Sequence, residues 1–157
     1  MPRIRTAESA RRGGGAQGRE NVVAISGRSH PLPRRSVARA ALAVLSDQEN
    51  PVLLSIAFVS RERMRTLNRR WKGKGTPTDV LAFPLAGPGG VVAGDVYVCP
   101  WVAARNAHRL GVPVRQELTR LVIHGVLHVL GYDHPEGAGR TASPMWRRQE
   151  RYLRGLR

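Results

Sequence analysis

The sequence has little cysteine, little lysine and no long hydrophobic run. Its single cysteine, Cys99, excludes an internal disulfide framework. Its longest apolar runs, such as residues 52–59, fall far short of the roughly 20 residues that a transmembrane helix needs. We therefore expect no membrane partner. The 157 residues and the 41% hydrophobic content are typical of one globular domain and exclude a disordered or collagen-like chain.

Acidic residues are also scarce relative to basic ones. The chain has 26 lysines and arginines against 11 acidic residues, a net charge of +15, and all but Lys72 and Lys74 of the basic residues are arginine. Codon bias explains the choice of arginine over lysine as readily as function does. The net charge itself attracts polyanions, of which nucleic acid is the commonest. Residues 1–20 hold five arginines and two glutamates, so a net +12 belongs to the rest of the chain.

The chain divides into a tail and one domain. Residues 1–20 contain three consecutive glycines and almost no periodic apolar residues, which predicts a flexible basic tail without the apolar stretch of a secretory signal. Residues 21–157 form the folded domain. Hydrophobic periodicity and turn residues predict strands at 22–25, 52–59, 79–83 and 94–99, and helices at 34–45, after Ser60, and at 101–110, 114–130 and 145–156. The third and fourth strands are placed to pair as a hairpin. This order indicates an α+β domain in which about five helices pack on a small mixed sheet.

Three of the five histidines lie within eleven residues, His124 to His134. His124 and His128 are four residues apart on an apolar helix, so both rings project from nearly one face. Gly131 stands where a glycine commonly ends a helix, after which the chain can return His134 to the same point. Three imidazoles with an open fourth position are typical of a catalytic zinc site. A lone histidine on such a helix would not indicate a metal site, but three histidines grouped in this way predict one Zn²⁺ per chain.

The spacing HxxxHxxGxxH is that of the metzincin metalloproteases, with one difference. Their general-base glutamate follows the first histidine, and here that position is Gly125. Peptide hydrolysis by that route needs a carboxylate to take a proton. A metallopeptidase-like hydrolase therefore stays an alternative that Gly125 and the positive charge both disfavour.

Several segments together resemble the YbeY family of bacterial ribosomal-RNA maturation endoribonucleases. HGVLHVLGYDH at residues 124–134 is similar to the family's HGxLHLxGYDH. LNRRWK at 67–72 and PTDVLAFP at 77–84 resemble LNxxYR and PTDVLSFP. Residues 94–96 and 145–150 resemble the family's GDI strand and C-terminal helix. The resemblance covers roughly residues 22 to 156.

The resemblance implies roles for particular residues. The metal ligands fall on His124, His128 and His134. The family's arginine that is associated with RNA cleavage falls on Lys72, which keeps the charge but lacks the bidentate fork of arginine. We expect Lys72 to position the scissile phosphate. The residues expected to contact RNA are Lys72, Arg70, Arg147 and Arg151.

Other residues near these motifs have plainer expected roles. Asp79 and Asp95 are expected to cap turns at strand starts. Asp133 is as well suited to orienting a histidine as to a plain turn. Met145 is placed either beneath the metal or, more commonly, in the core.

The resemblance implies a cytoplasmic, zinc-dependent endoribonuclease specific for single-stranded RNA. Its expected process is rRNA maturation together with biogenesis and quality control of the small ribosomal subunit, and its expected partners are rRNA and that subunit. A further alternative is a non-enzymatic ribosome-assembly factor whose metal is structural.

Overall fold

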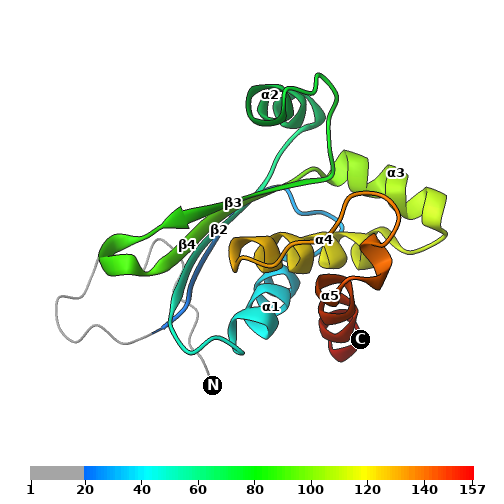
Figure 1. The fold of residues 1–157 in the computed structure, drawn as a ribbon. Helices are drawn as coiled ribbons and strands as arrows, with labels where there is room; N and C mark the ends of the chain where they lie inside the picture. The colour runs from blue at the N-terminus through cyan, green and yellow to red at the C-terminus, as the bar shows by residue number, and fades with distance from the viewer. Residues whose placement is uncertain (1–19) are drawn as a thin grey trace.

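The computed structural model describes residues 20–157, and the tail predicted at residues 1–20 lies outside them except for Glu20 (Figure 1). The predicted order of strands and helices is confirmed, and the expected bounds differ from those observed by three residues or fewer. The elements are β1 (Val22–Gly27), α1 (Arg34–Leu45), β2 (Val52–Phe58), α2 (Arg61–Lys72), β3 (Val80–Ala86), β4 (Val92–Val98), α3 (Pro100–Leu110), α4 (Val114–Val129) and α5 (Pro144–Gly155). A short 3₁₀ turn, η3 (Arg140–Ala142), precedes α5.

The four strands form one mixed sheet in the order β1-β2-β4-β3. β1, β2 and β4 are parallel, and Ile56 of β2 pairs with Ile25 on one side and Val96 on the other. β3 runs antiparallel to β4 at the edge, so the predicted hairpin is confirmed. The α+β class with a small mixed sheet is therefore the observed architecture.

One face of the sheet carries the main hydrophobic core. β2 buries every second residue, as expected for a strand with one face against helices. These side chains meet α1, α4 and α5, which lie together beneath the sheet in Figure 1. Met145 at the start of α5 is 1% exposed and belongs to this core, which is the commoner of the two fates expected for it.

Helix α4 runs through the centre of the domain and approaches the sheet closely. A Cβ atom added to Gly94 of β4 would lie 2.4 Å from Cγ1 of Val129, and one added to Gly125 of α4 would lie 2.5 Å from Cγ1 of Val96. Such distances are far below van der Waals contact, so both glycines are needed for the helix to seat on β4. This close contact sets the distance between α4 and the sheet.

Helix α2 packs on the opposite face of the sheet. There its Met64 and Leu67 form a second, smaller core with Leu81 and Cys99. Figure 1 shows α2 above the sheet, away from α1, α4 and α5. Cys99 is fully buried there. Among residues 20–157, no helix is both long and apolar enough to span a membrane.

Candidate metal centre

Helix α4 places two of the three predicted ligands one turn apart. His124 is buried and His128 is half-buried at the end of the helix that rests on β4. The helix then stops at a Schellman motif: the amide of Gly131 donates to the carbonyl of His128, and that of Tyr132 donates to the carbonyl of Leu127. Gly131 adopts φ 94°, a left-handed conformation that favours glycine, as its position predicted.

The loop after Gly131 brings His134 back to the helix. Nε2 of His124 lies 3.1 Å from Nε2 of His128 and 3.3 Å from Nε2 of His134. Nδ1 of His134 lies 3.0 Å from the carbonyl oxygen of Pro135, which sets the orientation of that ring. Asp133 accepts a hydrogen bond from the backbone amide of His134. The sequence therefore correctly predicted which three histidines come together.

Two of the three separations between the ring nitrogens fit a tetrahedral metal ion. Two imidazole nitrogens that share a zinc ion at 2.0–2.1 Å stand about 3.3 Å apart. The observed separations of 3.1 and 3.3 Å match that value. Within residues 20–157, these histidines are the one group of histidine, cysteine or carboxylate side chains whose ligand atoms all lie within 4.8 Å of one another.

The surroundings keep the histidines in the form that binds metal. Burial lowers the pKa of His124 to about 3, although its hydrogen bond to Gln149 acts in the opposite direction. Burial also lowers the pKa of His128, and the neighbouring His134 adds to this effect. Both rings are therefore neutral near pH 7, and a neutral imidazole has the free lone pair that a metal requires.

Gln149 of α5 orients the innermost ligand, a role that sequence reasoning missed. The Nδ1–H of His124 donates to Oε1 of Gln149 at 2.7 Å, and Gln149 is fully buried. This bond fixes the tautomer that leaves Nε2 of His124 facing the other two histidines. Met145, Gln149 and Leu153 follow one another at four-residue spacing, and all three are buried. A glutamine in the middle of an apolar stripe indicated a buried polar partner, because a buried amide needs a hydrogen bond.

Gly125 explains why the metzincin glutamate is missing. Its backbone faces Val96 of β4 and Val80 of β3, and no side chain fits between α4 and these valines. A glutamate at this position would therefore push the helix away from the sheet. The site offers three ligands without the general base that a metzincin peptidase uses.

The four residues expected to contact RNA lie on helices α2 and α5. Lys72 and Arg70 are exposed on α2, on the other face of the sheet. Arg147 of α5 donates to the carbonyl of Ala142, and Arg151 is exposed 4.0 Å from Asp47. Among the hydrogen bonds and ion pairs of residues 20–157, none joins these four side chains to the histidines. Their role stays a prediction.

The two aspartates expected at strand starts differ in outcome. Asp79 precedes β3 and accepts hydrogen bonds from the amide of Val80 and the side chain of Asn106, which confirms its capping role. The same prediction was wrong for Asp95, which lies inside β4. The strand begins earlier than expected because residues from Val92 onward already pair with both β2 and β3.

Comparison with known proteins gives consistent results. The model of the family described as "Endoribonuclease YbeY" matches residues 29–157. A protein named endoribonuclease YbeY from Anaeromyxobacter dehalogenans is 44% identical over 111 residues, which are 69% of this chain and 58% of that protein. One of the same name from Thermobifida fusca is 40% identical over 117 residues, 68% of this chain and 76% of that protein.

A solved structure shares the fold. The solution structure of a Thermotoga maritima protein superposes with a TM-score of 0.60 at 28% identity, covering 85% of this chain and 88% of the other. The family match extends over most of the described domain and includes all three histidines. The chain therefore belongs to the endoribonuclease YbeY family.

Proposed function

We propose that the protein is a zinc-dependent endoribonuclease that cuts single-stranded RNA. The observation that carries this proposal is the convergence of three imidazole nitrogens within 4.8 Å of one another at a helix that lacks the peptidase glutamate. Membership of the endoribonuclease YbeY family and a net charge of +15 both favour RNA over a peptide as the substrate.

Each residue of the centre has a distinct task. His124, His128 and His134 would hold the ion, and Gln149 keeps the ring of His124 in the ligating tautomer. A bound zinc ion supplies Lewis-acid charge beside a phosphodiester and lowers the pKa of a coordinated water. Lys72 would neutralise phosphate charge as a point cation, because lysine lacks the planar fork of arginine.

The biological setting proposed for this activity is the maturation of ribosomal RNA. We propose rRNA of the small ribosomal subunit as the substrate and the cytoplasm as the compartment, with a role in the biogenesis and quality control of that subunit. The excess positive charge lies mostly outside residues 1–20, so the folded domain itself supplies the attraction for RNA.

Cleavage assays with the zinc-loaded protein test this function against its alternatives. We expect cleavage of single-stranded RNA, none of a peptide library, and loss of RNA cleavage on adding a chelator. His128→Ala should be inactive, whereas His108→Ala, which removes an exposed histidine of α3, should remain active. Peptide cleavage would favour the metallopeptidase, and RNA binding without cleavage would favour a non-enzymatic assembly factor.

A further inference from the structure

A cavity of about 450 Å³ lies between α3, α4 and α5. Its walls include Asp79 before β3, Arg120 of α4, Arg140 of η3, and Trp146 and Glu150 of α5. This volume is within the range of small-molecule sites, about 300–1,000 Å³. None of these five residues has a place in the metal centre described above.

The cavity and the metal centre share helix α4. Arg120 lines the cavity one helical turn before His124, and Gln116 lines it one turn earlier. Glu150 accepts a hydrogen bond from Gln149, the partner of His124. Gln149 therefore links a lining residue of the cavity to the metal centre.

The cavity offers hydrogen-bond donors, acceptors and an aromatic ring. Nε of Arg140 is buried and has no hydrogen-bond partner, which leaves a donor in need of an acceptor. The guanidinium groups of Arg120 and Arg140 lie 5.7 and 6.0 Å from the centre of the Trp146 ring. Arg120 is already held by Glu117 in a two-point ion pair, whereas Glu150 accepts a single long bond of 3.4 Å.

This combination suits a nucleobase better than a phosphate. Carboxylates such as Asp79 and Glu150 repel a phosphate, but they accept hydrogen bonds from the amino and imino groups of a base. Arginine donates to the ring nitrogens and carbonyl oxygens of a base, and the flat face of a base stacks on tryptophan or on a guanidinium plane. We propose that the cavity binds one unpaired nucleobase of the RNA, next to the phosphodiester at the histidines. This inference rests on the proposed endoribonuclease function and assigns it a nucleotide-binding subsite.

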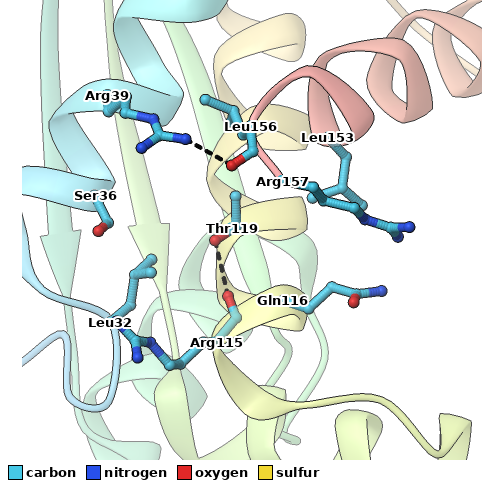
Figure 2. A pocket seen from close by; sticks show the side chains of 9 residues that line it. All are labelled: Leu32, Ser36, Arg39, Arg115, Gln116, Thr119, Leu153, Leu156 and Arg157. Carbon is cyan, nitrogen blue, oxygen red and sulfur yellow. Dashed lines mark hydrogen bonds between the residues drawn. The ribbon is translucent and has the colours of Figure 1, made fainter.

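A second hollow, shown in Figure 2, provides an internal contrast. It has a volume of about 230 Å³ between α1, α4 and α5, and its arginines are Arg39, Arg115 and Arg157. The nine lining residues include no carboxylate and no aromatic side chain. Arg39 donates to the carbonyl of Leu156, and in Figure 2 the three guanidinium groups point in different directions. This hollow therefore lacks both the stacking surface and the carboxylate acceptors of the larger cavity.

Titration of the full-length, zinc-loaded protein with mononucleotides tests the subsite. The probes are the four ribonucleoside 5′-monophosphates and ribose 5-phosphate, with binding followed by calorimetry. We expect at least one nucleotide to bind about tenfold more tightly than ribose 5-phosphate, because only the nucleotide carries a base. Arg140→Met should weaken nucleotide binding about tenfold, and Trp146→Leu should do the same, while Arg39→Met leaves it unchanged. Zinc content and circular dichroism establish that each variant is folded.

Two results would overturn the subsite. One is equal binding of every nucleotide and ribose 5-phosphate, which indicates a phosphate site alone. The other is equal weakening by Arg140→Met and Arg39→Met, which indicates general charge attraction. RNA cleavage measured in parallel separates the subsite from the proposed function: cleavage without nucleotide binding refutes the subsite alone, and nucleotide binding without cleavage refutes the function alone.

Discussion

Helices α4 and α2 carry the two parts of the expected site, and they hold their functional side chains in opposite ways. Ten of the 16 residues of α4 are buried, and its first metal ligand, His124, is among them. On α2, three of 12 residues are buried, and Lys72 stands in solvent at the last position. Packing therefore sets the position of a histidine on α4. The position of an exposed cationic side chain on α2 depends instead on the molecule that it contacts.

This difference separates two kinds of function. A metal site needs several donor atoms placed to within a few tenths of an ångström of their required positions. Buried helices supply that precision, together with side chains such as Gln149 that hydrogen-bond to a histidine of the site. Attraction of a phosphate backbone needs positive charge in the right region, and it tolerates mobile side chains. Substitutions on α4 should therefore act through geometry and stability, and substitutions on α2 through charge.

The largest effect is expected from loss of a metal ligand. Wild-type protein should carry about one zinc per chain, and His124→Ala, His128→Ala and His134→Ala should each lose most of it. RNA cleavage should fall by more than about 100-fold, beyond the cost of disturbing only a partner of a ligand. Metal analysis and RNA cleavage on the same samples make the measurement. Full metal content in all three variants would show that the histidines do not form the site.

A large loss of stability is expected when the contact between α4 and β4 is crowded. Gly125→Ala should cost about 1–3 kcal/mol in the free energy of unfolding, because the new methyl group overlaps Val96. Gly155→Ala is the matched control, since a Cβ on that glycine of α5 meets nothing within 4 Å. Denaturant unfolding measures both variants. Combining Gly125→Ala with Val96→Ala should recover part of the loss, and strict additivity of the two changes would refute the assigned contact.

Local patterns in the sequence predicted most of the fold and the convergence of the three histidines. Ser60 caps α2 through its side chain, and Gly131 ends α4 in a left-handed turn, each as its residue type indicates. Histidines four apart on one helix define a shared direction without any tertiary information. These features depend on neighbours along the chain, which is why one sequence was enough.

Such local patterns could not predict contacts between elements that are far apart in the sequence. Gln149 follows His124 by 25 residues, and only the packing of α5 on α4 makes it a partner. The cavity between α3, α4 and α5 joins residues from Asp79 to Leu153, so neither Arg120 nor Arg140 was recognisable as part of a site. The start of β4 before Asp95 likewise depends on pairing with β2 and β3.

A smaller effect is expected from the residue that orients His124. Gln149→Leu keeps the volume but removes the acceptor for Nδ1–H, which should weaken zinc binding about 10–100-fold. Gln149→Glu restores an acceptor and should recover most of that affinity. Competition with a chromogenic chelator gives the dissociation constants. Equal affinities in Gln149→Leu and wild type would leave the glutamine as a packing residue only.

The smallest effect is expected on the exposed helix α2, where the chain supplies its own control. Lys72→Glu should lower the cleavage of single-stranded RNA by about tenfold, because it reverses a charge proposed to face the phosphate. Lys72→Arg should keep or raise activity, since arginine offers two parallel donors to a phosphate. Zinc content should stay normal in both variants, because α2 and α4 pack on opposite faces of the sheet.

Lys74 distinguishes position from charge in this test. It is exposed two residues beyond Lys72, so Lys74→Glu makes the same change in net charge at a neighbouring point. If Lys72 contacts the phosphate, cleavage by Lys74→Glu should stay close to wild type, and rising salt should weaken RNA binding less steeply in Lys72→Glu than in Lys74→Glu. Equal losses in the two variants would mean that α2 contributes only to the general positive field. Arg120 and Arg140, which line the larger cavity, would then be the next arginines to substitute in the same assay.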